Sequence, residues 1–433
     1  MYSNRVPELT RRQAIVGAAK ALLGVGLAPL SDSLLASTAQ GAMTAPSPAA
    51  RVIYLNMIGG LSHIDTFDVK PESPDVQGPV RAINTNVAGV RVSEFLPRLA
   101  NLMDRTAIIR SMTSNQGDHP AAQYLLHRSY LQGGTISHPT LAAWALRSLG
   151  KINPELPGSV SIAGNDDSVS TGFLESQFAP VPIGDPLQGL PNSRRAARVN
   201  DAQLSRRLKL SQALNLEFRA HYKSRQTDSH ADMFAEAVRL MKSRDLQAFD
   251  VAEEPDSLRT RYGASSFGQG CLLARRLAEH GVRFVEVGLD GWDSHYDNFV
   301  VVGEKAVIID QAISALLTDL EQRGMLEDTL VVVGTEFGRT PAINPAHKNG
   351  RDHHPKAFSC LLAGGGVQGG QVYGSTDAQG AEVVDRAVAI PDFNATIAWA
   401  LGLPIEEKIA DPSGQLFQIA DNGRPVKELF GVS

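Results

Sequence analysis

Carboxylate and imidazole side chains, which are common ligands of divalent metal ions, gather next to four apolar runs of this sequence. The candidate ligands in these segments are His63, Asp65, Asp293, His295, Glu336, Asp352, His353 and His354. Asp293 and His295 are separated by one residue, so both side chains point the same way if the segment is extended. A single Asp after a strand is more often a turn or cap residue than a ligand, but the combination indicates a metal site.

The competing interpretation of these residues is a hydrogen-bonded network of buried polar groups at the end of a sheet. Arg339, three residues after Glu336, has two interpretations of its own. Its guanidinium suits the binding of an anion such as phosphate or sulfate, and it equally suits an ion pair with Glu336 or Asp352. For the metal itself, imidazole and carboxylate ligands predict zinc first, with manganese or calcium as alternatives.

The elements that must position these side chains are strands whose carboxyl ends share one edge of a sheet. Apolar, β-branched runs predict strands at Arg51–Ile58, Thr106–Arg110, Val160–Ala163, Gly281–Gly288, Leu330–Val333 and Phe358–Leu362, and a short edge strand at Val372–Gly374. Helical patterns occur at Pro120–Leu131, Ser137–Leu149, residues 200–280, Val302–Arg323 and Pro391–Leu401. The repeated order of strand, polar loop and helix predicts an α/β fold with a doubly wound, mostly parallel central sheet flanked by helices. In such sheets, ligands bind beyond the carboxyl ends of the strands.

Length and composition fit a single large domain. The chain has 433 residues, of which 43% are hydrophobic, which is enough for a sizeable core. Residues 164–192 are rich in Pro, Gly and Asn and predict a long loop. We therefore expect residues 43–433 to form one domain, with a loop and helical insertion at about 164–260.

Charge and cysteine content exclude two classes of protein. Lys and Arg total 41 against 46 Asp and Glu, so the net charge is -5 and no basic surplus indicates a nucleic-acid partner. Cys271 and Cys360 each lie in an apolar run, which predicts buried free thiols rather than a disulfide-stabilised fold.

The first 42 residues resemble a twin-arginine export signal. Arg11 and Arg12 precede a modestly apolar run from Ala14 to Leu30, and small residues such as Ala39 and Ala42 supply a cleavage zone. A cytosolic amphipathic helix is the alternative, but Ala and Gly dominate and no polar face repeats. No later run is long enough to span a membrane. We expect export by the twin-arginine machinery and a periplasmic or extracellular mature protein.

Five segments of the sequence carry a resemblance to a known family. They are GGLSHIDTFDVKP (Gly59–Pro71), IIRSMTSNQGDHPAAQY (Ile108–Tyr124), GWDSHYDN (Gly291–Asn298), TEFGRTP (Thr335–Pro341) and GRDHHP (Gly350–Pro355). In this order, and with the preceding signal, they resemble the exported proteins catalogued as domain of unknown function 1501 (DUF1501). The resemblance covers essentially the whole mature chain. It implies the fold of the alkaline phosphatase and sulfatase superfamily, with one or two metal ions at the strand ends.

The resemblance also implies roles for individual residues. It suggests one ion held by Asp293, His295 and His353, with His354 as a competitor, and a second ion held by Asp65, Glu336 and Asp352, with His63 as a competitor. Hydrolases of this superfamily place Ser, Thr or a modified Cys at a helix start that in this chain reads Asp118-His119-Pro120. Three hypotheses follow: His119 acts as nucleophile or base, water activated by the metal attacks directly, or hydrolysis has been lost. Arg339 would hold the anionic oxygens.

Two functions are consistent with these expectations. The first is a metal-dependent hydrolase of phosphate or sulfate esters, acting on a small anionic ester or on a sulfated or phosphorylated glycan. The alternative is a non-catalytic relative that binds a polysaccharide, a cell-wall component or a protein partner through the same cleft. The missing hydroxyl at the helix start favours the second function, and the retained acids and imidazoles favour the first.

Overall fold

The computed structural model describes residues 49–190, 193, 199–221 and 238–432. These residues belong to one compact unit, Thr44–Ser433. The predicted export signal at residues 1–42 lies outside the described residues and stays a prediction. In the part of the chain that is described, no helix is both long and apolar enough to cross a membrane.

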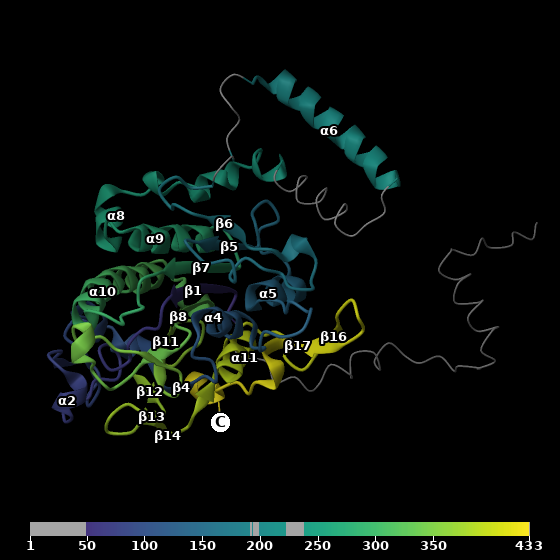
Figure 1. The fold of residues 1–433 in the computed structure, drawn as a ribbon. Helices are drawn as coiled ribbons and strands as arrows, with labels where there is room; N and C mark the ends of the chain where they lie inside the picture. Colours follow the sequence, from purple (N-terminus) through teal and green to yellow (C-terminus); the bar gives the residue numbers. More distant parts are fainter. Residues whose placement is uncertain (1–48, 191–192, 194–198, 222–237, 433) are drawn as a thin grey trace, which may run out of the picture. The chain divides into compact units, whose positions relative to one another are not determined.

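A central sheet organises the described residues (Figure 1). Its strands are β1 (Arg51–Met57), β4 (Thr106–Thr113), β5 (Ser159–Ile162), β6 (Val181–Ile183), β7 (Phe284–Leu289), β8 (Thr329–Gly334), β11 (Phe358–Ala363), β12 (Gln371–Tyr373) and β15 (Val388–Ala389). The order is β12-β4-β11-β8-β1-β7-β5-β6, and β15 also pairs with β4. β11 runs antiparallel to both of its neighbours, and the other pairs are parallel. The expected mostly parallel sheet is therefore confirmed.

Helices cover both faces of this sheet, because alternate residues of its strands face two separate cores. On β1, Ile53, Leu55 and Met57 pack in one core with α9 (Ser266–Glu279) and α10 (Asn298–Gln322). Val52 and Tyr54 pack in a second core with α4 (His119–Arg128), α5 (Leu141–Leu149) and α11 (Ile390–Ala400). The result is the predicted doubly wound sandwich, whose helices can be followed in Figure 1.

Smaller elements complete the described part of the chain. The helices are α2 (Pro74–Gln77), α3 (Pro97–Ala100), α6 (Asp201–His221) and α8 (Asp256–Tyr262), and the 3₁₀ turns include η3 (Ser176–Phe178), η4 (Arg244–Phe249), η5 (Val251–Glu253) and η7 (Pro345–His347). Two-stranded pairs are formed by β2 (Ala82–Asn84) with β3 (Arg91–Ser93), β9 (Gly338–Arg339) with β10 (His353–His354), β13 (Ser375–Thr376) with β14 (Val383–Asp385), and β16 (Lys408–Ala410) with β17 (Leu416–Gln418).

The long loop predicted at residues 164–192 differs from the structure in one respect, since it contains β6, the last strand of the sheet. β6 includes Pro182, which lacks a backbone N–H and so suits a strand with only one neighbour. The assignment of residues 164–260 as an insertion is not tested by this observation and stays a prediction. Cys271 and Cys360 are buried and free, as expected.

The topology brings the predicted site residues to one edge of the sheet. The carboxyl ends of β1, β4, β7 and β8 share this edge, and the antiparallel β11 begins there. The loop after β1 lies close to the loop after β7. Gly59 has φ of +113°, and a Cβ at this position would be 2.7 Å from the backbone nitrogen of Asp293. Glycine is therefore required for the two loops to approach.

Candidate metal centre

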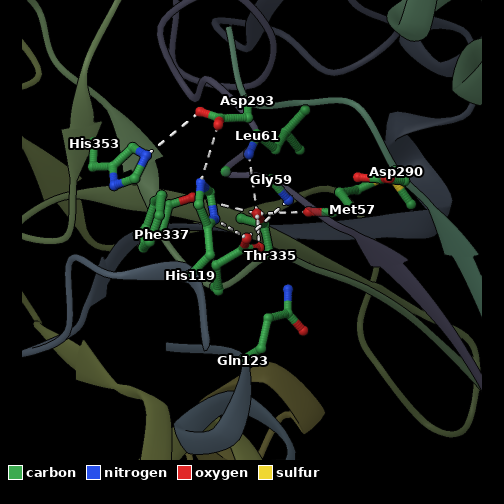
Figure 2. Close-up of polar contacts among 12 residues, drawn as sticks. Met57, Gly59, Leu61, His119, Gln123, Asp290, Asp293, Thr335, Phe337 and His353 are labelled. Atoms are coloured by element: carbon green, nitrogen blue, oxygen red, sulfur yellow. Dashed lines mark hydrogen bonds and ion pairs between the residues drawn. The ribbon is translucent and has the colours of Figure 1, made fainter. Parts of the chain in front are cut away.

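Three of the predicted site residues, His119, Asp293 and His353, converge at this edge (Figure 2). His119 begins α4, Asp293 lies in the loop after β7, and His353 lies in β10. The Nε2 atom of His119 is 3.5 Å from Oδ2 of Asp293, and the Nε2 atom of His353 is 3.4 Å from Oδ1. One ligand atom of each residue lies within 4.8 Å of the other two. We call these three residues the ligand cluster.

The ligand cluster is compact enough to surround one metal ion. Ligand atoms at the usual zinc distances of about 2.0–2.1 Å lie about 3.3–3.4 Å from one another in tetrahedral geometry. The two distances between nitrogen and oxygen are 3.5 Å to Oδ2 and 3.4 Å to Oδ1 of Asp293, and one ligand atom from each residue lies within 4.8 Å of the other two. Two imidazoles and one carboxylate also leave a fourth position open, which is the pattern of catalytic rather than structural zinc sites.

Both imidazoles of the ligand cluster are held through Nδ1. Nδ1 of His119 is 2.9 Å from Oε1 of Glu336, and Nδ1 of His353 is 2.7 Å from the carbonyl oxygen of Gly117. An ionised carboxylate and a carbonyl can only accept, so both Nδ1 atoms donate, and Nε2 of the neutral ring carries a lone pair. Both Nε2 atoms are buried without a hydrogen-bond partner. Metal-binding histidines are held in this way, with the second nitrogen donating to a carboxylate or carbonyl.

Burial and neighbouring charges set the protonation of the ligand cluster. Burial lowers the pKa of His353, which keeps this ring neutral at pH 7. Burial also opposes the charged form of His119, but the hydrogen bond and charge of Glu336 outweigh it and raise the pKa. For Asp293, the effect of burial is outweighed by the hydrogen bond and charge of Arg339, and the pKa falls to about 2. Asp293 is therefore an anion at neutral pH, and a cation that binds here competes with a proton for Nε2 of His119.

Arg339 is fully buried and fixes the carboxylate of Asp293. Its Nη2 atom donates to Oδ1 of Asp293 at 2.5 Å. Its other N–H groups donate to the backbone carbonyl oxygens of Gly59, Gly60 and Arg351, and Nη1 also lies 3.5 Å from Nδ1 of His295. The guanidinium thus binds groups of the chain itself, and its ion pair is with Asp293.

The segment after β8 supports both imidazoles. Glu336 is fully buried and accepts from the backbone N–H of Gly59 at 2.8 Å, in addition to its contact with His119. The ring of Phe337 packs against His119 and His353, with centroid distances of 4.8 and 4.6 Å. Phe337 was not among the residues predicted from the sequence. An apolar residue between two site residues, Glu336 and Arg339, could have indicated that its ring packs in the site.

His295 and Asp352 lie beside the ligand cluster and are open to solvent. Nδ1 of His295 is 2.6 Å from Oδ1 of Asp293, and its Nε2 is 3.8 Å from Oδ1 of Asp352. The side chains of His295 and Asp352 are 34% and 58% exposed. They form the rim of the site rather than part of the group of three.

Asp65 is held in an ion pair away from the ligand cluster. Its carboxylate accepts two hydrogen bonds from Arg351, at 2.9 and 3.1 Å, and both side chains are fully buried. Ser62 and Asn298 donate to the same carboxylate at 2.5 and 2.9 Å. With four donors, Asp65 joins the loop after β1 to the loop before β11. Arg351 was not among the residues predicted from the sequence. Its position next to Asp352 does not indicate that it pairs with Asp65.

His63 and His354 also have partners outside the ligand cluster. Their rings stack with a centroid distance of 6.2 Å. The Nε2 atom of His63 is 2.8 Å from the carbonyl oxygen of Gly380, and that of His354 is 2.7 Å from the carbonyl oxygen of Ala381. The two imidazoles therefore hold the segment around residues 380–381.

Comparisons with known proteins find one family and several solved structures that are similar to this chain. The family described as "Protein of unknown function (DUF1501)" matches residues 49–430. No curated protein matches the chain. Among solved structures, the chain is similar to the PsFucS1 sulfatase from Pseudoalteromonas sp. (14% identity, 96% of this chain, 77% of that chain, TM-score 0.40) and to a phosphonate monoester hydrolase from Silicibacter pomeroyi (12% identity, 89% and 77%, TM-score 0.40). It is also similar to a protein in the alkaline phosphatase superfamily from Vibrio parahaemolyticus (10% identity, 89% and 74%, TM-score 0.39).

Proposed function

The chain belongs to the DUF1501 family, whose function is unknown, and from the geometry of its site we propose that it is a metal-dependent hydrolase of phosphate or sulfate esters. One observation carries the proposal. The Nε2 atoms of His119 and His353 are buried, unpartnered and directed at Asp293, while each Nδ1 is anchored by an acceptor. The donor set favours zinc, with manganese or calcium as alternatives.

In this proposal the ligand cluster holds the ion and the surrounding residues orient it. When bound, a divalent ion supplies Lewis acidity to an ester oxygen and makes water a stronger nucleophile at neutral pH. Glu336 fixes the ring of His119, and Arg339 keeps Asp293 ionised and in place. His119 is then a ligand rather than the nucleophile or base, because Glu336 and the ion occupy both of its nitrogens.

We assign proton transfer to His295. It lies beside Asp293, and its Nε2 atom faces the solvent-exposed rim near Asp352. An imidazole held at one nitrogen and open at the other can transfer a proton to a leaving group. The proposed substrates are small anionic esters or sulfated or phosphorylated glycans met after export from the cytoplasm.

A non-catalytic binding role is the second candidate, and the start of α4 favours it. The sequence there is Asp118-His119-Pro120. Among the described residues, no Ser or Thr hydroxyl forms a hydrogen bond with a member of the ligand cluster. A protein of this kind would bind a polysaccharide, a cell-wall component or a protein partner at the same site.

Turnover by the zinc-loaded mature protein separates the two roles. Hydrolysis of nitrophenyl phosphate or nitrophenyl sulfate, lost in Asp293→Ala and reduced in His295→Ala with zinc content unchanged, supports the hydrolase. His280→Ala, at the end of α9, is the matched control and should retain full activity. Zinc binding without turnover of either ester would favour the binding role. A well-folded protein that binds no divalent ion would overturn the hydrolase and leave the binding role standing.

A further inference from the structure

Gln123 is a buried glutamine one helical turn after His119 on α4. Residues four apart lie on the same face of a helix, so both side chains face the sheet. The Gln123 side chain is buried, with 4% exposure, and its Nε2 atom has no hydrogen-bond partner. Buried donors nearly always have a partner. A donor without one beside the ligand cluster therefore indicates a missing acceptor.

The direction of this amide follows from the charge of Glu286 on β7. Asn56 on β1 places its Nδ2 atom 3.2 Å from Oε1 of Glu286, and because an ionised carboxylate only accepts, the Asn56 atom must be the donor. The same Nδ2 atom donates to Oε1 of Gln123 at 3.3 Å, and Nδ2 of Asn165 donates to it at 3.1 Å. Two donors thus fix Oε1, and Nε2 is the free end of the amide.

Figure 2 shows the amide nitrogen of Gln123 turned toward the side of the site where His119 and Thr335 lie. We propose that Nε2 of Gln123 donates a hydrogen bond to one oxygen of the tetrahedral anion, a phosphate or sulfate group, that binds at the ligand cluster. The inference rests on the proposed function, because this anion is the group on which the hydrolase would act. A preorganised neutral donor stabilises an oxyanion, and no N–H of Arg339 is left for such a ligand because its N–H groups meet Asp293, His295 and backbone carbonyls.

The test compares the zinc-loaded protein with its Gln123→Met variant, which keeps the side-chain length and removes both N–H groups. Isothermal titration with inorganic phosphate measures anion binding, and inorganic sulfate is titrated in parallel to identify the preferred anion. We expect the Kd of the preferred anion to rise about 10-fold or more, as for the loss of a hydrogen bond to a charged group. Zinc content should stay unchanged, because Gln123 forms no hydrogen bond with the ligand cluster. An unchanged Kd would overturn the inference while leaving the proposed function standing.

Gln269→Met is the matched control. Gln269 is also a buried helical glutamine, but its Nε2 atom donates to the carbonyl oxygens of Gly263 at 2.7 Å and Arg259 at 3.0 Å. This variant should lose stability and keep its anion Kd. Equal weakening of anion binding in both variants would mean a general packing effect and would overturn the inference.

A second variant, Gln123→Glu, keeps the inference testable if Gln123→Met does not fold. The carboxylate still accepts from Asn56 and Asn165 but has no N–H to donate, so anion binding should weaken at least as much as in Gln123→Met. Retention of wild-type affinity by this variant at pH 8 would contradict the inference. A wild-type protein that binds zinc but neither phosphate nor sulfate would overturn both the inference and the hydrolase.

Discussion

Replacing Asp65 with asparagine should destabilise the protein strongly without removing zinc from the molecules that remain folded. The side chains of Asp65 and Arg351 are both 0% exposed, and two hydrogen bonds join them. An amide at this position leaves the guanidinium buried without a counter-charge. Breaking one member of a buried ion pair costs about 3–5 kcal/mol. That is a large part of the roughly 5–15 kcal/mol by which native proteins are stable, and it changes the unfolding equilibrium constant by about two to four orders of magnitude.

Equilibrium unfolding in urea measures this free-energy change, and elemental analysis gives zinc per folded chain. The partner variant Arg351→Met and the double variant complete a cycle, in which the double variant should be less destabilised than the sum of the two. Asp75→Asn changes an exposed acid at the start of α2 and should shift stability by less than about 0.5 kcal/mol. A variant Asp65→Asn that is as stable as wild type but has lost its zinc would refute this reasoning and make Asp65 a ligand.

Three further predictions follow from the same contacts. Glu336→Gln should weaken zinc binding about 10- to 100-fold, because the group that accepts the hydrogen bond from His119 loses its charge. Competition with a chromogenic chelator measures the zinc affinity. A variant that binds zinc as tightly as wild type would contradict the role of Glu336 in orienting His119. Burial lowers the pKa of His63 from 6.5 to about 4. Between these two pH values the unfolded chain therefore binds more protons than the folded chain. The free energy of unfolding should be highest above pH 6.5 and should fall by about 3 kcal/mol as the pH drops to 4. His63→Gln, which can still donate to Gly380, should flatten this part of the stability profile. Burial raises the pKa of Cys360 to about 12, and neither it nor Cys271 should react with a thiol reagent until denaturant is added.

The central strands can be predicted from the sequence because they are buried on both faces. β1, β8 and β11 read as continuous apolar runs, which few other elements produce. β6 could not be predicted because it has only three residues, one of them Pro182, within a segment rich in loop-forming residues. The direction of β11 cannot be predicted either, because an apolar run looks the same whether the strand is parallel or antiparallel to its neighbours.

The candidate site shows a sharper limit. Residue type and strand position place Asp65 and Asp293 at the same edge of the sheet, and nothing in their local sequence separates them. What separates them is a partner distant in sequence, since Asp65 meets Arg351 across 286 residues. Asp293 instead faces two imidazoles that are anchored at Nδ1. A single sequence contains no signal for such pairings, so the metal-binding role of each candidate depends on the folded geometry.

The most direct test of the metal centre is zinc X-ray absorption combined with elemental analysis of the purified protein. We predict one zinc ion per chain at the ligand cluster, with imidazole nitrogens at about 2.0–2.1 Å, and loss of that ion in both Asp293→Ala and His353→Ala. A well-folded protein that stays free of metal after reconstitution, or that keeps its zinc in both variants, would contradict this account.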